Sequence, residues 1–382
     1  PISSIQIPQS VETFNSNAFV GCENLAKFTG KFASTDGRFL INDSQKLIGF
    51  APYGISEVVI PQSAFSISTY IFYGCSNITK IELPNTLQQI YGNAFSGCSI
   101  SEITIPQSVT YITAGTFENC PNLTTFKGKF ATDDGRCLIN NAGVLVAAAT
   151  VGLTEFAVPD GVTHIYITLG REESTIEHLT IPASVQQISG ALIQNNSNLK
   201  TVTINGCPEI YPYTFSNCPN LTAIYLPNAV TPPAAYIYSG DQYWNAFVDC
   251  PNLKIYVPTS AVSSYKAATG WSDYADIIFS DGSPAIETLD ASYITDITPG
   301  IGFAWIKFTK VPYGTKYQIY SGDTELEYSI YTEDDTYIHA HVSNLELNAT
   351  MPIKIKVSNP DIENASFSDE ITMTVGNIYQ LT

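Results

Sequence analysis

The stretch Asn77–Pro106, NITKIELPNTLQQIYGNAFSGCSISEITIP, contains one complete unit of a repeat and the beginning of the next. Ile78, Ile81 and Leu83 have the spacing L-x-x-L-x-L, and the same spacing returns 22 residues later at Ile100. A unit of this length cannot bury its own apolar face, so it becomes stable only by packing against copies of itself. The stretch therefore predicts a solenoid.

The same pattern recurs through residues 1–279. Since each coil contributes one strand to the same face, we expect eleven strands stacked at one strand spacing. They begin at Ile5, Phe28, Val58, Ile81, Ile103, Phe126, Phe156, Leu179, Val202, Ile224 and Ile255. On most of them one outward residue lies between two apolar ones. This outward column is Gln6, Val59, Glu82, Thr104, Ala157, Thr180, Thr203, Tyr225 and Tyr256, a nearly uncharged surface that is aromatic at one end.

Two nearly identical segments interrupt the spacing, Phe28–Gly54 and Phe126–Gly152. Each contains Asp-Gly-Arg, an apolar strand, a short polar turn and a second apolar strand. That order is typical of a β-hairpin. We therefore expect two hairpins inserted into the stack.

Six of the eight cysteines take the same position in successive coils, and Asn196 fills this position in another coil. Stacked equivalents lie about 5 Å apart, but their side chains run parallel and do not meet as a disulfide requires. No C-x-x-C and no Cys/His pair at ligand spacing indicates a metal. We expect buried, reduced thiols. The six are Cys22, Cys75, Cys98, Cys120, Cys218 and Cys250, whereas Cys137 and Cys207 lie outside the series.

Two coils depart from the repeat. His164–Ile176, HIYITLGREESTI, lacks the Ala-Phe-x-x-Cys half and carries the charged cluster Arg171-Glu172-Glu173. A later coil is lengthened by Thr231–Trp244, TPPAAYIYSGDQYW. Insertions often lie on the binding face, and the aromatic side chains of this loop resemble a recognition element; the alternative is a loop folded onto its own coil. With the aromatic end of the outward column they form the predicted ligand-binding set: Tyr225, Tyr236, Tyr238, Tyr243, Trp244 and Tyr256.

The pattern changes near residue 258. Thr259 or Ser260 can cap a short helix there, and Trp271 offers apolar cover, so residues 258–279 are predicted to close the solenoid. Residues 280–284 read as a linker, and residues 285–382 carry six or seven short alternating segments with turn signals. That spacing predicts a small all-β sandwich.

Composition excludes several classes of partner. The net charge of −18 argues against nucleic acid and against anionic lipid surfaces. No apolar run approaches the roughly 18 residues of a membrane span. The chain starts at Pro1 in mid-repeat, so we expect any export signal or lipid anchor upstream. With 23 Tyr and only 14% charged residues, the sequence favours an uncharged, hydrogen-bonding β-surface.

Motifs for catalysis are missing from the sequence: it has no GxSxG, HExxH, P-loop or GxGxxG. His339 and His341 would share one strand face, but no third ligand accompanies them. We therefore expect no catalytic residue, no cofactor and no metal.

The rungs I-x-I/L-P-x-S-V-x-x-I and the turns A-F-x-G-C-x-N-L resemble the BspA-like leucine-rich repeats of bacterial surface proteins, closely at Ile81–Leu123 and Ile5–Leu25. The D-G-R-x-L-I hairpins and the ending around Tyr265 and Trp271 are similar to that family as well. The resemblance covers about residues 1–279 and implies a right-handed solenoid, export and display at the cell surface. The C-terminal segment resembles a fibronectin type III-like or an immunoglobulin-like domain, around Trp305 and Asn344–Val357.

Together these observations predict a non-enzymatic, monomeric bacterial protein, secreted or at the cell surface. It would mediate protein–protein interaction or adhesion to host extracellular proteins or to other bacteria. The alternative is a carbohydrate-binding surface protein, because exposed Tyr and Trp rings can stack on sugars.

Overall fold

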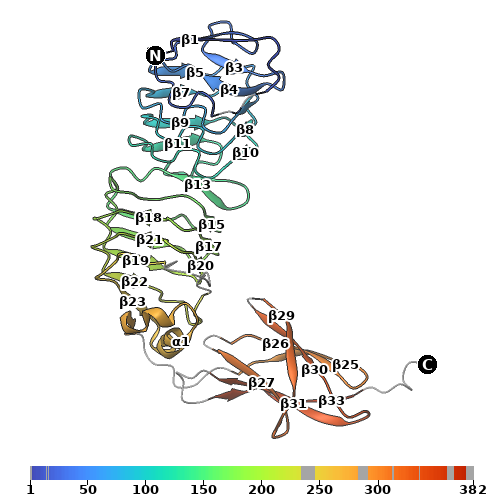
Figure 1. Cartoon of the computed structure of the whole chain (residues 1–382). Coiled ribbons are helices and arrows are strands. Elements are labelled where there is room, and N and C mark those ends of the chain that lie inside the picture. Colours follow the sequence, from blue (N-terminus) through green and yellow to red (C-terminus); the bar gives the residue numbers. More distant parts are fainter. Residues whose placement is uncertain are drawn as a thin grey trace, which may run out of the picture. The chain divides into compact units, whose positions relative to one another are not determined.

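The computed structural model describes residues 2–13, 15, 17–233, 246–282, 291–311, 314–334, 336–358 and 365–375. The chain forms two compact units, one of residues 1–225 and 233–254, the other of residues 226–232 and 255–382. The first unit is a stack of coils (Figure 1), and the chain as a whole contains a β-solenoid of about eleven turns. The predicted solenoid is confirmed.

Each coil of the first unit contributes one short strand to a common face, the one that carries the predicted outward column; we call it the first face. The register joins the predicted rungs directly, for example Ile5 opposite Phe28 and Phe156 opposite Leu179. The ladder is not continuous: it consists of the parallel sets β1-β2, β5-β7, β9-β11 and β14-β16-β19-β22. The strands are β1 (Ser4–Ile7), β2 (Lys27–Gly30), β5 (Glu57–Val59), β7 (Lys80–Glu82), β9 (Glu102–Ile105), β11 (Thr125–Gly128), β14 (Glu155–Ala157), β16 (His178–Ile181), β19 (Thr201–Ile204) and β22 (Ala223–Tyr225).

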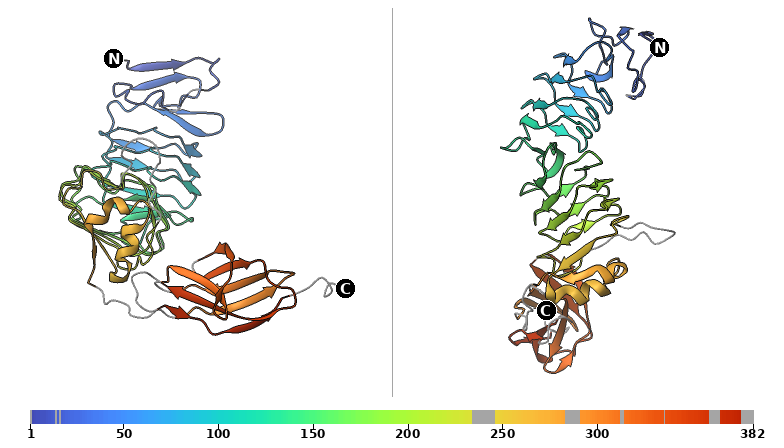
Figure 2. Two further views of the ribbon diagram at one scale, coloured as in Figure 1. Left: turned by 60° about the horizontal axis from the view of Figure 1, so that its bottom comes forward. Right: turned by 90° about the vertical axis from the view of Figure 1, so that its left-hand side faces the viewer.

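The two predicted hairpins are present, and each begins a five-stranded sheet on the second face of the solenoid. The inner strand of each hairpin continues in parallel into the following coils, so one sheet has the order β3-β4-β6-β8-β10 and the other β12-β13-β15-β17-β20 (Figure 2). These strands are β3 (Phe39–Ile41), β4 (Lys46–Phe50), β6 (Ser66–Ile67), β8 (Gln89–Ile90), β10 (Tyr111–Ile112), β12 (Cys137–Ile139), β13 (Val144–Ala148), β15 (His164–Ile165), β17 (Gln187–Ile188) and β20 (Glu209–Ile210).

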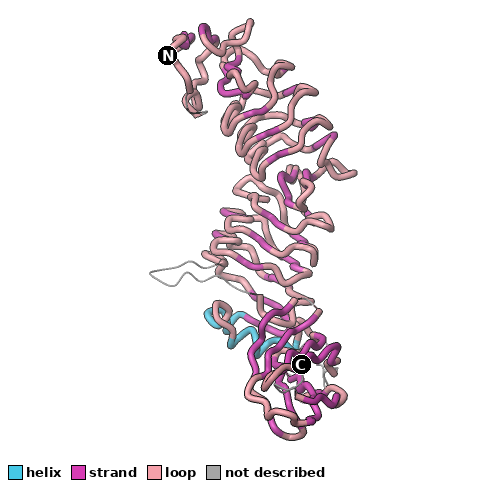
Figure 3. The backbone as a smooth tube through the Cα atoms, turned by 90° about the vertical axis from the view of Figure 1, so that its right-hand side faces the viewer, coloured by secondary structure: helices cyan, strands magenta, loops and turns pink. Residues whose placement is uncertain are grey.

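The third side of each coil is mostly turn, and Figure 3 shows how short the strands are along the stack. Only β18 (Ile193–Gln194) and β21 (Phe215–Ser216) pair as strands here among the described residues. Elsewhere single backbone bonds join neighbouring coils, as where Phe95 N–H donates to Thr116 O at 3.0 Å.

Phenylalanine rings from the third side form the centre of the core. Phe72, Phe95 and Phe117 stack nearly parallel, with centroids 5.2 Å apart at each step. All three are buried. A fully buried aromatic ring in such a row contributes both apolar burial and ring–ring contact.

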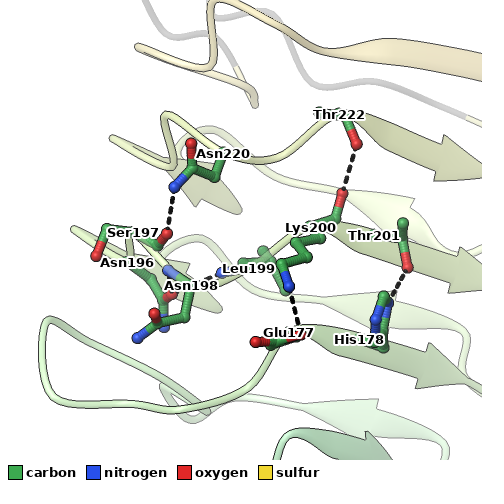
Figure 4. A network of polar contacts seen from close by, with 10 residues as sticks. All are labelled: Glu177, His178, Asn196, Ser197, Asn198, Leu199, Lys200, Thr201, Asn220 and Thr222. Atoms are coloured by element: carbon green, nitrogen blue, oxygen red, sulfur yellow. Dashed lines mark hydrogen bonds and ion pairs between the residues drawn. The ribbon is translucent and has the colours of Figure 1, made fainter.

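Polar side chains in the turns tie each coil to the one before it (Figure 4). Asn220 Nδ2 donates to Ser197 O at 2.7 Å, and Thr222 Oγ1 donates to Lys200 O at 3.2 Å. Asn77 and Asn122 make the equivalent bonds one coil back. Because these amides bond to turn carbonyls of the preceding coil, the N-x-T motif of the repeat has a structural role.

None of the eight cysteines, all of which are described, forms a disulfide. Cys98 Sγ donates to Phe72 O and Cys120 Sγ to Phe95 O, each at 3.2 Å, so both thiols occupy equivalent positions in successive coils. Cys218 donates in the same way to Ile193 O, and the buried Asn196 bonds to two turn carbonyls of the coil before it. The predicted file of reduced thiols is confirmed for these coils.

In the second unit, β23 (Lys254–Val257) pairs in parallel with β24 (Ile278–Ser280). The segment between them forms η1 (Thr259–Ala261), α1 (Val262–Ala267) and η2 (Ser272–Ile277). Tyr265 and Trp271 are both buried, and their ring centroids lie 4.9 Å apart. The expected helix cap is wrong: the N-cap of α1 is Ala261, which makes no side-chain capping bond, and the Thr259 hydroxyl bonds to that of Ser280 at 2.5 Å.

The rest of the second unit contains two antiparallel sheets, of orders β25-β26-β30-β29 and β28-β27-β31-β32, with β33 also paired to β31. Their inner side chains share one buried cluster that includes Ile306, Phe308, Ile319 and Ile355. The strands are β25 (Ile294–Pro299), β26 (Ala304–Thr309), β27 (Lys316–Ser321), β28 (Thr324–Glu325), β29 (Tyr328–Glu333), β30 (Tyr337–Val342), β31 (Thr350–Ser358), β32 (Ser366–Phe367) and β33 (Ile371–Thr374).

Candidate functional site

The residues predicted from the sequence to bind a ligand fall into three groups. Tyr225 lies in the first unit at the outward position of β22, opposite Thr203, with 39% of its surface exposed. Tyr256 lies in the second unit opposite Phe279, whose ring is 6.2 Å away. Tyr236, Tyr238, Tyr243 and Trp244 lie outside the described residues.

The first face has the outward column that the sequence predicts. Val59, Glu82 and Thr104 are exposed at successive rungs, and Thr180 and Thr203 are half-buried. Charged side chains also lie on this face: Lys127, at the outward position of β11, bonds to Glu102 at the start of β9 at 2.7 Å. Such exposed pairs contribute about 0–1 kcal/mol, so they shape the surface more than they stabilise it.

The second face carries a more elaborate surface that sequence reasoning missed. On its first sheet, Lys46, Ser66, Gln89 and Tyr111 align in one column across four coils. Tyr91 Oη donates to Gln89 Oε1 at 2.9 Å, the Lys46 ammonium lies 4.7 Å from the Tyr91 ring, and the Tyr111 ring is 5.7 Å from Tyr91. The exposed ring of Tyr111 is thus held against an ordered partner.

The second sheet repeats this arrangement with other residues. Gln187 lies between His164 and Glu209 in the column. It accepts a bond from Tyr166 Oη at 2.6 Å and donates from Nε2 to Tyr211 Oη at 2.6 Å and to Glu209 at 3.2 Å. Tyr166 remains 43% exposed. We call the two sets together the tyrosine surface: Lys46, Gln89, Tyr91 and Tyr111 on one sheet, and His164, Tyr166, Gln187, Glu209 and Tyr211 on the other.

This surface suits recognition through hydrogen bonds and aromatic contact. Tyr rings present a large apolar area with a polar end, and their partners fix their rotamers before any ligand arrives. Among the described residues, no three His, Cys, Asp or Glu side chains gather as a metal site would require.

Three thiols of the solenoid, those of Cys75, Cys120 and Cys137, are poor nucleophiles. Burial raises the pKa of Cys75 and of Cys137 to about 12 and that of Cys120 to about 11. At neutral pH these groups are therefore protonated, and the thiolate needed for nucleophilic chemistry is scarce.

A signal for the tyrosine surface was present in the sequence. In several coils the isoleucine of the second-face strand lies between a polar residue and a tyrosine, as in Gln89-Ile90-Tyr91, His164-Ile165-Tyr166 and Glu209-Ile210-Tyr211. Alignment of the coils on this second isoleucine, and not only on the first strand, would have shown the column.

Comparison with protein-family profiles finds the BspA type leucine rich repeat region, in six copies over residues 1–35, 49–133 and 148–266. A search of curated proteins finds no similar sequence.

Similar solved structures include a leucine rich cell surface protein from Faecalibacterium prausnitzii, 22% identical, which covers 74% of this chain and 80% of that one at a TM-score of 0.46. The pneumococcal vaccine antigen PcpA is 16% identical over 73% of this chain and 77% of that one, with a TM-score of 0.43. A leucine-rich repeat protein from Eubacterium ventriosum is 19% identical over 67% and 79%, with a TM-score of 0.39.

Proteins with BspA-like repeats are cell-surface proteins and are generally non-enzymatic. In the described part of this chain, no helix has the length and apolar character to cross a membrane. The profile match extends over more than half of the sequence and includes every residue of the tyrosine surface except Lys46. The chain therefore belongs to the BspA type leucine rich repeat family.

Proposed function

We propose that this chain is a secreted or surface-displayed bacterial protein that binds another protein, in adhesion to host extracellular proteins or to other bacteria. The observation that carries the proposal is the tyrosine surface, in which exposed rings are fixed by side chains of neighbouring coils. Family membership supports surface protein interaction and does not favour the carbohydrate alternative.

Energetic arguments favour this face as the binding surface. Tyrosine is enriched among the few interface residues that dominate binding energy. Immobilising a side chain on binding costs about 0.5–1.5 kcal/mol in rotamer entropy, and a ring that is already ordered loses less of this entropy than a free one. Tyr111 and Tyr166 combine both properties, because each is exposed and each contacts a fixed neighbour.

The first face of the first unit is the competing surface, with Tyr225 as its aromatic residue; Tyr256, in the second unit, is kept as a separate predicted residue. We keep this predicted set as the alternative site on the same protein, because Tyr225 is exposed on β22.

For residues 285–382 we propose a β-sandwich of the fibronectin type III-like or immunoglobulin-like class, acting as a spacer or second binding module. Support comes from the two antiparallel sheets and their common buried cluster. The proposed boundaries remain those predicted from the sequence: a repeat domain at 1–279 with its cap near 258–279, a linker at 280–284 and the sandwich at 285–382.

Solid-phase binding of the purified chain to a panel of extracellular-matrix proteins and to bacterial cells tests the proposal. The double variant Tyr111→Ser/Tyr166→Ser should lose at least tenfold in affinity for any ligand found. Tyr53→Ser is the matched control, because Tyr53 is 54% exposed in the first hairpin and lies outside the surface.

Other outcomes decide against parts of the proposal. If Tyr225→Ser weakens binding and the double variant does not, the binding surface is the first face. If the chain binds members of a glycan array and no protein of the panel, the carbohydrate alternative replaces protein binding.

A further inference from the structure

A pocket of about 590 Å³ opens in the first unit beside the irregular coil His164–Ile176. Most of its lining comes from three segments: the turn at Phe117–Cys120, the end of β13 at Val146–Ala148, and Ile167–Thr175. This volume lies within the range of ligand pockets, about 300–1,000 Å³. The tyrosine surface does not include any of these residues.

Two local losses of volume produce the pocket. The irregular coil lacks the Ala-Phe-x-x-Cys half, so no ring continues the stack beyond Phe117. In addition, Ala148 stands where the first hairpin has Phe50, since Phe50 pairs with Phe39 in the same register in which Ala148 pairs with Cys137. In the first hairpin the Phe50 ring fills this space and contacts Phe72 at 4.6 Å.

One wall of the pocket contains backbone N–H groups whose equivalents in other coils donate to carbonyl groups of the next coil. Along the third side, Phe95 N–H donates to Thr116 O at 3.0 Å and Gly97 N–H to Glu118 O at 2.9 Å, and the equivalent bonds join the coils at Phe72 and Phe215. The next donors in this series are Phe117 N–H and Asn119 N–H. Neither has an acceptor within the described part of the chain.

These two donors lie two residues apart, the spacing at which an extended strand presents its carbonyl groups to a neighbour. Phe117 and Asn119 both line the pocket, so an incoming carbonyl oxygen could supply the acceptor that their N–H groups lack. The interruption of this series after the coil of Phe117 thus leaves two N–H groups to which an incoming backbone can bond.

Charge at the pocket is predominantly negative. Glu118, Glu172 and Glu173 line it, against the single cation Arg171. The Glu118 carboxylate accepts a 3.5 Å bond from Thr168 N–H on the opposite wall, and Glu172 and Glu173 are exposed at the rim. Negative charge around a backbone template favours a cationic side chain on the incoming segment.

We propose that this pocket binds an extended peptide segment of a partner protein, with its carbonyl groups on Phe117 N–H and Asn119 N–H and a lysine or arginine side chain near Glu172 and Glu173. The inference deepens the proposed function, because it rests on the chain being a protein-binding protein. The pocket would be a second binding site, separate from the tyrosine surface, with a preference for a lysine or arginine side chain.

Fluorescence anisotropy with seven-residue labelled peptides tests the proposal on the full chain. Three sets share alternating valines and differ only at the intervening positions, which are lysine, glutamate or serine. We expect the lysine set to bind at least tenfold more tightly than the glutamate set, and the preference to weaken with salt as it does for exposed charges.

Two variants separate backbone addition from nonspecific charge attraction. Ala148→Phe restores the ring of the first hairpin and should abolish binding, whereas Ala142→Phe, an exposed position of the same hairpin, should not change it. Glu172→Lys/Glu173→Lys should weaken the lysine set at least tenfold. Glu155→Lys/Asp160→Lys, which makes the same change in net charge at exposed positions elsewhere, should change affinity less than twofold.

Hydrogen exchange provides the decisive readout. Bound lysine peptide should slow exchange of the Phe117 and Asn119 amides by at least tenfold. The inference is overturned if no peptide set binds at 1 mM, if Ala148→Phe binds as the parent does, or if both amides exchange at an unchanged rate. Those results would leave the proposed function intact whenever the chain still binds a matrix protein or a cell through the tyrosine surface.

Discussion

The two hairpins, Phe28–Gly54 and Phe126–Gly152, share a backbone scaffold but have different surroundings. In both, the Arg of Asp-Gly-Arg donates to the carbonyl just after the outgoing strand, at 3.2 Å from Arg38 to Ala51 O and at 3.1 Å from Arg136 to Ala149 O. The first hairpin packs Phe39 and Phe50 against a complete coil, whereas the second has Cys137 and Ala148 beside an incomplete one. Two side-chain substitutions and a shortened coil therefore convert a filled core into an open pocket without a change of fold.

The largest effect should come from emptying the first hairpin. Phe50→Ala removes a buried ring that contacts Phe39 at 5.6 Å and Phe72 at 4.6 Å, so we expect a loss of about 3–5 kcal/mol in the free energy of unfolding. Urea unfolding followed by circular dichroism measures it. The reciprocal change, Ala148→Phe, should alter stability by less than about 0.5 kcal/mol because the new ring enters open space. Equal costs for the two variants would show that the hairpins are not packed differently.

A smaller effect tests what the hairpins share. Gly30 and Gly128 have φ of 88° and 82°, and a Cβ at either would collide with the carbonyl oxygen of Ile7 or Ile105. Gly→Ala at either position should cost about 1–3 kcal/mol, and the two costs should agree. Gly152→Ala, at φ 75° with open space around the Cβ, is the control and should cost less. A clear difference between Gly30→Ala and Gly128→Ala in thermal unfolding would contradict a common scaffold.

The smallest effect concerns the turn of the second hairpin. A hydrogen bond from the Thr132 hydroxyl, followed by one from Arg136 N–H, holds the pKa of Asp134 below its ordinary value of 3.8. Since the folded pKa is depressed, its stabilisation is complete above pH 3.8 and is lost as pH falls through the folded value. Asp134→Asn should therefore cost less than about 1 kcal/mol at pH 7, because the group is largely exposed.

Urea midpoints for Asp134→Asn and the parent at pH 7 and pH 2 measure this effect. The difference between the two proteins should shrink at pH 2. A difference that stays constant across this range would mean that the carboxylate charge is not what stabilises the turn.

Sequence reasoning predicted the features that depend on residue spacing. The rung positions, both hairpins and the equivalence of Cys98 and Cys120 follow from a repeat whose apolar residues must face one interior. The spacing also marked His164–Ile176 as irregular. It did not reveal the pocket, because a cavity depends on the volume difference between Phe50 and Ala148 in three dimensions.

Two other features were missed for physical reasons. The predicted helix cap failed because the Thr259 hydroxyl bonds to Ser280, a residue 21 positions away whose proximity only the fold creates. The strand β24 has three residues and follows a short helical segment. Its sequence pattern is therefore too short to distinguish a strand from apolar residues that merely cover the strand before it. The aromatic residues Tyr236, Tyr238, Tyr243 and Trp244 remain a prediction.

Most bonds that side chains donate to backbone carbonyls of a neighbouring coil point in one direction along the stack. Asn220, Thr222 and Cys98 each donate to a carbonyl that precedes them by 22 to 26 residues, so the acceptors already exist when the donors are synthesised. A nascent chain can thus secure each turn onto finished structure as it emerges, N-terminus first, without waiting for its own C-terminus. The direction of these bonds therefore favours assembly of the coils from the N-terminus toward the C-terminus.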